Sequence, residues 1–205
     1  MVCTMKKFLI IDGSSMLSTS YYGNLPKSVL FAKTDEEKEK HYSEILRTSK
    51  GEYTNALFTM LRTLISLYKK VKPDYVAVAF DVSRDTFRRT QLAESYKANR
   101  KEAPAPLKEQ FIAMENLLQK IGCQVLMDKD YEADDFAASL VKKFESPDLD
   151  TYVLTKDHDY FQLVSDYTRL WRVTDKEKVK DLQQRYGLYA GKEGYDSLPA
   201  GIFEY

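Results

Sequence analysis

The chain of 205 residues lacks the features of disulfide-rich and membrane-spanning proteins. Its two cysteines, Cys3 and Cys123, cannot form a disulfide framework, and reduced thiols are typical of cytosolic proteins. The apolar run after Lys6 and Lys7 has only four residues, 8–11, too few for a signal peptide or a membrane span. The 31 basic residues balance 31 acidic residues, so the net charge predicts no partner. We expect a soluble, cytoplasmic protein with no membrane partner.

Four short apolar runs alternate with amphipathic helical patterns. The runs are 8–11, 75–80, 123–127 and 151–155, and the helical patterns are 54–71, 107–121 and the segment that follows Glu132. Short continuous apolar runs are typical of strands buried on both faces of a parallel sheet. The order strand, helix, strand, helix, strand, helix, strand predicts an α/β fold, namely a doubly wound, mainly parallel sheet with helices on both faces.

Acidic residues follow all four predicted strands. They are Asp12 after the first strand, Asp81 after the second, Glu132, Asp134 and Asp135 after the third, and Asp157 and Asp159 after the fourth. Right-handed crossovers put the C-terminal ends of parallel strands on one edge, so all seven should meet there. Each group alone also fits a solvated helix start or a turn. Seven repelling carboxylates at one edge instead favour a metal site.

The residue types narrow the choice of metal and of chemistry. Carboxylates without a set of cysteine or histidine ligands favour Mg²⁺ or Mn²⁺ over a zinc–thiolate site. Seven carboxylates exceed what one octahedral ion needs. We therefore expect two ions about 4 Å apart, which would clamp the attacking and leaving oxygens of a phosphodiester. Hydrolysis of a nucleic-acid backbone is the leading hypothesis.

Two charged segments lie between the predicted elements. The segment after Val82 carries Arg84, Arg88, Arg89, Lys97, Arg100 and Lys101, with the aromatic residues Phe87 and Tyr96 among them. Basic residues with interleaved aromatics suit a phosphate backbone with stacked bases, although a solvated basic helix has the same composition. Residues 27–50 mix both charges without an apolar stripe, which predicts an exposed helix or loop without chemistry. His41 in this insertion is expected at the surface.

Five motifs in order resemble the 5′-nuclease domain of the bacterial DNA polymerase I type, within the flap endonuclease family. They are Phe8–Ser15 (FLIIDGSS), Val76–Arg88 (VAVAFDVSRDTFR), Tyr96–Arg100 (YKANR), Tyr131–Asp135 (YEADD) and Thr155–Leu163 (TKDHDYFQL). The resemblance implies a PIN-like catalytic domain over residues 1–174. Its implied activity is that of a metal-dependent 5′-3′ exonuclease and structure-specific 5′-flap endonuclease. Such an enzyme acts on DNA with 5′ flaps or ends, and on RNA primers, in replication and repair.

The resemblance also assigns roles to single residues. Asp12, Asp81, Glu132 and Asp134 would hold the first ion, and Asp135, Asp157 and Asp159 would hold or orient the second. Lys97 and Arg100 match a basic pair in a helical arch, here residues 83–106, where they would contact the scissile phosphate and stabilise its developing charge. Tyr96 would stack on a base or pack within the arch. Thr54, Asn55 and Ala56 resemble a structural signature of the family.

The chain departs from the family pattern in three places. Lys156 and His158 stand where the family has glycine and a basic residue, and Thr19 replaces a basic residue. Residues 175–205 lack the Gly-rich helix-three-turn-helix module that grips duplex DNA and carries further aspartates. We expect this segment to be a linker or the start of that module, and cleavage to be weak without it. A polymerase domain on the same full-length chain is a candidate partner.

Two other functions fit the same residues. A non-catalytic module for branched DNA would use the acids for one structural cation, and a PIN-type ribonuclease would cut RNA instead of DNA. A metal-dependent phosphatase would have no need of the basic arch.

Overall fold

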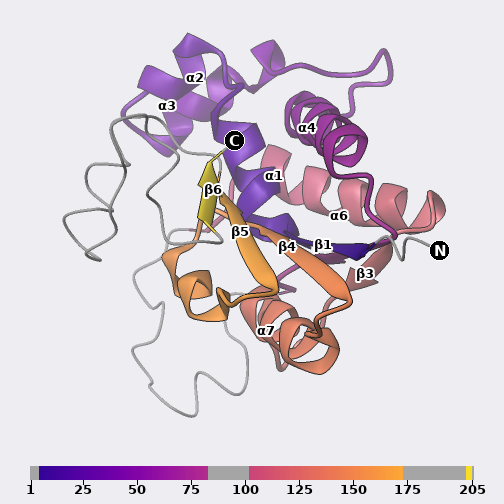
Figure 1. The fold of residues 1–205 in the computed structure, drawn as a ribbon. Coiled ribbons are helices and arrows are strands. Elements are labelled where there is room, and N and C mark those ends of the chain that lie inside the picture. The colour runs from indigo at the N-terminus through magenta and orange to yellow at the C-terminus, as the bar shows by residue number, and fades with distance from the viewer. Residues whose placement is uncertain (1–4, 83–101, 173–201, 205) are drawn as a thin grey trace, which may run out of the picture.

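The computed structural model describes residues 5–82, 102–172 and 202–204, and it shows a sheet of six parallel strands with helices on both faces (Figure 1). The strands are β1 (Lys6–Asp12), β2 (Tyr75–Ala79), β3 (Gln124–Leu126), β4 (Leu149–Leu154), β5 (Thr168–Arg172) and β6 (Ile202–Glu204). Their order is β3-β2-β1-β4-β5-β6. The first strand of the chain therefore lies inside the sheet, hydrogen-bonded to β2 and to β4.

Helices cover the sheet in two layers. The helices are α1 (Gly13–Tyr22), α2 (Lys27–Phe31), α3 (Asp35–Lys40), α4 (Asn55–Val71), α6 (Ala105–Lys120) and α7 (Ala133–Phe144), with 3-10 turns η1 (Tyr42–Glu44) and η2 (His158–Leu163). The core over one face is built from α1, α4 and α6, and that over the other from α7 and η2 (Figure 1). In the part of the chain that is described, no helix combines the length and the apolar character needed to cross a bilayer.

Side chains of β1 enter both cores, as a strand buried on two faces requires. Leu9 and Ile11 pack with α1, α4 and α6, whereas Phe8 and Ile10 pack against α7, because successive side chains point to opposite faces. All four predicted strands are present, with ends shifted by at most two residues. The predicted doubly wound parallel sheet is confirmed.

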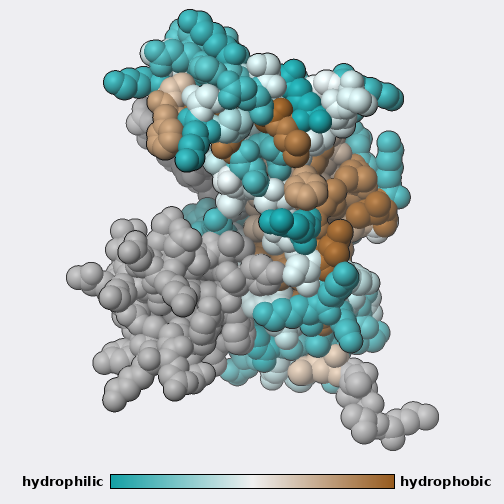
Figure 2. Space-filling view, turned by 90° about the horizontal axis from the view of Figure 1, so that it is seen from above, coloured by the Kyte–Doolittle hydropathy of each residue, from teal (hydrophilic) through white to brown (hydrophobic). Residues whose placement is uncertain are grey.

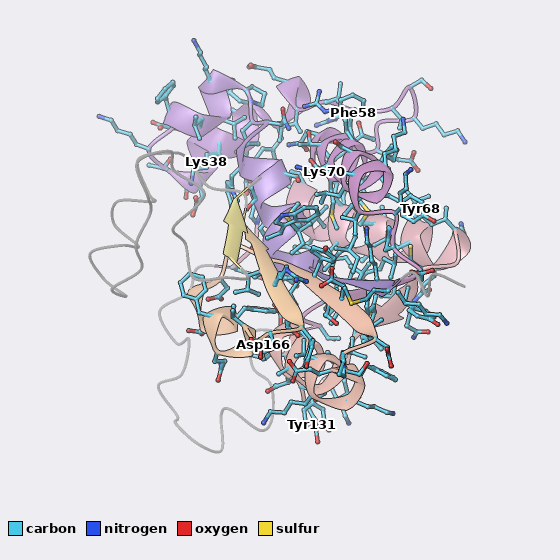
Figure 3. All side chains as sticks on the ribbon, viewed as in Figure 1. Lys38, Phe58, Tyr68, Lys70, Tyr131 and Asp166 are labelled. Atoms are coloured by element: carbon cyan, nitrogen blue, oxygen red, sulfur yellow. The ribbon has the colours of Figure 1, made fainter. Side chains whose placement is uncertain are left out.

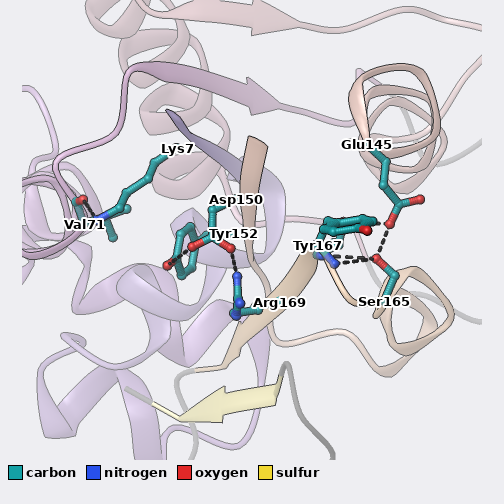
Figure 4. Close-up of polar contacts among 9 residues, drawn as sticks. Lys7, Val71, Glu145, Asp150, Tyr152, Ser165, Tyr167 and Arg169 are labelled. Carbon is teal, nitrogen blue, oxygen red and sulfur yellow. Dashed lines mark hydrogen bonds and ion pairs between the residues drawn. The ribbon is translucent and has the colours of Figure 1, made fainter. Parts of the chain in front are cut away.

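Strand β5 was not predicted because its polar residues hide the pattern of a strand. Leu170 is fully buried, but Arg169 beside it is charged. That charge is satisfied by an ion pair with Asp150 of β4, whose other carboxylate oxygen accepts a hydrogen bond of 2.7 Å from the Tyr152 hydroxyl (Figure 4). The pairing partner lies on another strand, so the local sequence carries no sign of it.

The charged insertion 27–50 folds as short helices above the sheet. It is held by two apolar side chains, Val29 and Ile45, each 2% exposed within the core of α1 and α4. His41 Nδ1 lies 2.7 Å from Glu44 Oε1 in a largely exposed pair, in agreement with a surface role. The prediction of an exposed segment was therefore correct for the charged residues, but it overlooked the two residues that fasten it.

The outer face of α4 carries exposed apolar side chains. Ile65 and Tyr68 belong to the helical pattern over 54–71, yet they are 55% and 56% exposed, and Phe58 is 58% exposed. Figure 3 labels Phe58 and Tyr68 on this helix, and Figure 2 shows an apolar area on the same side of the molecule. The apolar arc of α4 is wider than the face that packs against α1 and α6. Ile121, the C-cap residue of α6, is also exposed.

Gln110 of α6 joins α6 to the start of α4. Its Oε1 accepts a hydrogen bond of 2.8 Å from the Ala56 backbone N–H, and its Nε2 donates to Asn55 Oδ1 at 2.9 Å. Asn55 Nδ2 in turn donates to the Tyr21 carbonyl at 3.1 Å. Gln110 is fully buried, so water cannot replace its amide as the hydrogen-bond partner of the Ala56 N–H and the Asn55 side chain. The signature at 54–56 is thus a structural device that connects three helices.

Replacing Gln110 by leucine should lower the free energy of unfolding by about 2 to 3 kcal/mol, because the buried Ala56 N–H and Asn55 amide would lose their partner. Urea denaturation would measure the change. The matched control is Gln119→Leu at an exposed position of the same helix, where we expect a change below about 0.5 kcal/mol. Equal effects of the two substitutions would contradict the role of this buried amide.

Candidate active site

A cavity of about 290 Å³ lies at the C-terminal edge of the sheet. Its lining includes six of the seven predicted acids, which are Asp12, Asp81, Glu132, Asp134, Asp157 and Asp159. They come from the ends of β1, β2 and β4 and from the start of α7, which follows β3. The predicted convergence of these six acids at one edge is what the structure shows. Asp135 does not line the cavity.

Asp12 forms the buried floor of the cavity and is held at both carboxylate oxygens. It is the last residue of β1 and the N-cap of α1, where its Oδ1 accepts a hydrogen bond of 2.9 Å from the Ser15 backbone N–H. Its Oδ2 accepts a hydrogen bond of 2.8 Å from the Thr155 hydroxyl at the end of β4. The strand therefore ends in a carboxylate whose direction is set by two neighbouring elements.

Asp81 connects β2 to the first helix and to α7. Its backbone N–H donates to Ser14 Oγ at 2.8 Å, and its Oδ1 accepts from the Ala133 backbone N–H at 2.8 Å. Close packing makes this approach possible, since a Cβ added to Gly13 would lie 2.6 Å from the Phe80 ring. A larger residue than glycine would push α1 away from Asp81.

The acidic start of α7 divides into cavity residues and a capping residue. Glu132 is the N-cap and is 3% exposed, and Asp134 lies in the first turn, where the helix dipole favours negative charge. Asp135 is the third helical residue, and its carboxylate accepts a hydrogen bond of 3.0 Å from the Glu132 backbone N–H. Asp135 thus helps to cap the helix that presents the other two acids.

Asp157 and Asp159 stand at the mouth of the cavity, where both are exposed. Asp157 is the N-cap of η2, and its Oδ1 accepts from the Asp159 backbone N–H at 3.0 Å. Its own N–H donates to the Thr155 hydroxyl at 3.0 Å. Thr155 is fully buried and touches both Asp12 and Asp157, so it ties the floor of the cavity to its mouth.

The carboxyl group of Asp12 ionises at a higher pH than that of an exposed aspartate. Burial is the main cause that raises its pKa to about 6, and repulsion from Asp81 and Asp157 adds to it, while the hydrogen bonds from Ser15 and Thr155 act in the opposite direction. The ionised form of Asp12 therefore lowers the stability of the fold unless a positive charge lies nearby.

The donor atoms suit a hard divalent cation. Carboxylate oxygens and water are the ligands that Mg²⁺ and Mn²⁺ prefer, and the lining residues whose side chains the structure describes include neither cysteine nor histidine. Among the described residues, however, no three Asp, Glu, Cys or His side chains stand close enough to enclose an ion as they are placed. A bound cation would thus require side-chain rotation or bridging waters, as is usual for Mg²⁺.

Five residues that line the cavity were not assigned to the site from the sequence: Ser14, Ser15, Ser18, Ala133 and Tyr160. Ser14, Ser15 and Ser18 follow Asp12 within six residues, Ala133 lies between Glu132 and Asp134, and Tyr160 follows Asp159. Their proximity to the acids in the sequence was a usable signal. Tyr160 is 2% exposed, and burial together with the surrounding acids raises the pKa of its hydroxyl.

The predicted nucleic-acid residues lie outside the described residues. They are Arg84, Arg88, Arg89, Tyr96, Lys97, Arg100 and Lys101, all within 83–101. Their assignment to a basic arch stays a prediction.

Comparison with known proteins gives one family match and several relatives. The family described as 5′-3′ exonuclease, N-terminal resolvase-like domain, matches residues 7–187. A 5′-3′ exonuclease of Aquifex aeolicus is 36% identical over 162 residues, which are 79% of this chain and 49% of that protein. DNA polymerase I of Chloroflexus aurantiacus is 41% identical over 153 residues, which are 75% of this chain and 16% of that protein.

The fold is also similar to that of a solved structure, bacteriophage T5 flap endonuclease in a pseudo-enzyme–product complex with DNA and metal ions. The TM-score is 0.55 and the identity 18%, over 89% of this chain and 61% of that one. At this identity the likeness concerns the fold alone. The chain spans about half the length of the exonuclease relative and a smaller part of the polymerase.

The raised pKa of Asp12 predicts how the stability of the metal-free protein depends on pH. In the unfolded chain Asp12 ionises near pH 3.8, but in the fold only near pH 6, so stability should fall as pH rises through this window and stay lower above it. Asp12→Asn keeps the shape and should raise the free energy of unfolding at pH 8 in EDTA by about 2 to 3 kcal/mol.

Urea denaturation in EDTA at several pH values would measure this effect. The control is Asp148→Asn, which removes a carboxylate from the exposed turn before β4, at the opposite edge of the sheet. We expect no comparable gain in stability for this variant. If Asp12→Asn instead lowers the stability at pH 8, the hydrogen bonds to the ionised Asp12 contribute more free energy than burial of its charge costs.

Proposed function

We propose that this chain, which belongs to the 5′-3′ exonuclease family, is a metal-dependent 5′-3′ exonuclease and 5′-flap endonuclease. The family membership rests on the match of residues 7–187 to the N-terminal resolvase-like domain of that family. The observation that carries the proposal is the single cavity lined by six acids from four separate strand ends. A parallel sheet gathers these acids only at this edge, which is where open α/β sheets bind their ligands. Hydrolysis of DNA phosphodiesters, as in flap and primer removal during replication and repair, is the activity this site suits best.

The acids would hold two ions, Mg²⁺ or Mn²⁺. We assign Asp12, Asp81, Glu132 and Asp134 to the first ion and Asp157 and Asp159 to the second, with Asp135 orienting the start of α7. When bound, such ions lower the pKa of a water and neutralise the charge that develops on the phosphate. The protein supplies the fixed positions of the carboxylates, through the bonds of Ser15, Ala133 and Thr155 to Asp12 and Asp81.

The substrate we propose is DNA with a 5′ flap or end, and RNA primers are a second candidate substrate. Its phosphates would be attracted by the basic segment, in which Lys97 and Arg100 would contact the scissile phosphate and stabilise its charge. Two comparisons support the choice of DNA: the T5 structure holds DNA and metal ions, and a relative is a DNA polymerase I. On this basis we also propose a polymerase domain on the full-length chain and a cytoplasmic location.

The proposed domain boundaries rest on the stretch of sequence whose motifs resemble the family. We propose that residues 1–174 form the catalytic domain and that 175–205 lead toward a DNA-gripping module. The structure describes only residues 202–204 of the latter segment, as strand β6 beside β5. A longer chain that cleaves no faster would argue against such a module.

Asp134→Asn should lower the rate of cleavage of a 5′-flap DNA by about a hundred- to a thousandfold, because charge stabilisation in the transition state would be lost. The measurement is single-turnover cleavage of a labelled flap duplex, with Mg²⁺, Mn²⁺ and Ca²⁺ compared. Binding of the same DNA should be retained. Asp166→Asn, at an exposed position in the loop before β5, is the matched control and should cleave at the wild-type rate (Figure 3).

The outcome separates the candidate functions. Wild-type protein that binds the flap but never cleaves it, with either Mg²⁺ or Mn²⁺, would be a binding module. Cleavage of single-stranded RNA without cleavage of DNA would indicate a PIN-type ribonuclease.

A further inference from the structure

Tyr160 brings an unpaired hydroxyl to the acidic cavity. Its ring packs in the core between the sheet and α7, in the same cluster as Ile10, Ala137 and Val153. The side chain lines the cavity and is 2% exposed, and its hydroxyl oxygen, buried from solvent, has no hydrogen-bond partner. Among the described residues only one other buried side-chain atom, on Arg169, is unpaired, and that guanidinium forms an ion pair with Asp150.

An unpaired buried hydroxyl needs a physical reason. Buried polar groups nearly always have a partner, since leaving one unpaired costs free energy that phenylalanine at the same place would avoid. The groups around Tyr160 are carboxylates, and among them Asp12 and Asp134 do most to raise the pKa of its hydroxyl, after burial itself. A phenol O–H can donate a hydrogen bond to a carboxylate oxygen, and carboxylates line the cavity that Tyr160 borders.

The same acids are not yet arranged around an ion. No three of the described Asp, Glu, Cys or His side chains form a group that could enclose a cation. Binding of the proposed cations thus requires rotation of a carboxylate or bridging waters. The unpaired hydroxyl of Tyr160 lies beside these carboxylates, and it can donate a hydrogen bond to one that reorients when a cation binds.

We propose that Tyr160 is a positioning residue for the cation site, whose O–H donates to a carboxylate oxygen of Asp12 or Asp134 in the cation-bound protein and holds it as a ligand. Hydrogen bonds to ligating carboxylates orient them and contribute to metal affinity. The inference rests on the proposed function, because it assumes that the cavity binds divalent cations. It goes further in naming a non-acidic residue on which their affinity depends.

The test is Tyr160→Phe, which removes one oxygen and leaves the ring. Calorimetric titration with Mn²⁺ alone, without DNA, should show affinity about tenfold weaker than that of the wild type, at the low end for residues that support metal ligands. In EDTA the variant should melt at the same temperature or about 2 to 4 °C higher, because the unpaired hydroxyl is gone. Saturating Mn²⁺ should raise its melting temperature less than that of the wild type.

If Tyr160 positions a ligand, Tyr160→Phe should be as stable as the wild type or more stable in EDTA, but should gain less stability from Mn²⁺. A residue that only packs in the core would change the melting temperature equally in both conditions. Tyr152→Phe is the matched control, since its hydroxyl is paired with Asp150 at 2.7 Å away from the cavity lining (Figure 4). This control should lower the melting temperature equally in EDTA and in Mn²⁺, and leave the Mn²⁺ affinity unchanged.

The results also distinguish this inference from the proposed function. Wild-type protein that binds no Mn²⁺ would overturn the metal site, and with it the role of Tyr160. Wild-type binding with unchanged affinity in Tyr160→Phe would overturn the inference alone. A lower melting temperature of Tyr160→Phe in EDTA would show that the hydroxyl already has a stabilising partner in the metal-free protein.

Discussion

Mutual repulsion of carboxylates at one edge of a parallel sheet is the constraint on which the site depends. Strands β1, β2 and β4 all end there, and each ends in or leads to an aspartate, so the topology brings like charges together. Burial is the main cause of the raised pKa of Asp12, and repulsion from Asp81 and Asp157 adds to it. A divalent cation would relieve this repulsion, which is why an arrangement that is unfavourable for the fold suits hydrolysis of phosphodiesters.

Hydrogen bonds from neighbouring elements hold the carboxylates in place despite this repulsion. Thr155 of the β4 end holds Asp12 of β1, and Ala133 of α7 holds Asp81 after β2. Asp135 caps α7 and so fixes the residues that present Glu132 and Asp134. Asp12 and Asp81 are therefore each held by an element other than their own. Such cross-connections keep the distances between acids set by the whole sheet instead of by one flexible loop.

Much of this arrangement was open to prediction, and the errors have physical causes. Short apolar runs identified four strands, and the acids after them identified six residues of the cavity. The polar strand β5 was missed because Arg169 is neutralised by Asp150, a residue nineteen positions away by sequence number (169 − 150) but adjacent in the sheet. Ile65 and Tyr68 of the helical pattern over 54–71 are exposed because periodicity shows an apolar arc, while the packing of α1 and α6 decides how much of that arc is covered.

The sequence by itself determined the parallel α/β class, the order of the first four strands along the chain, and the acidic chemistry of the site. These follow from local patterns, since apolar runs and charges after them are readable without knowing any neighbour. Only the tertiary structure decided that Asp135 turns to cap α7, that Thr155 bridges two acids, and that the Tyr160 hydroxyl meets no partner. Those facts depend on which side chains from distant segments meet in space, and such contacts leave no trace in the local order of residues.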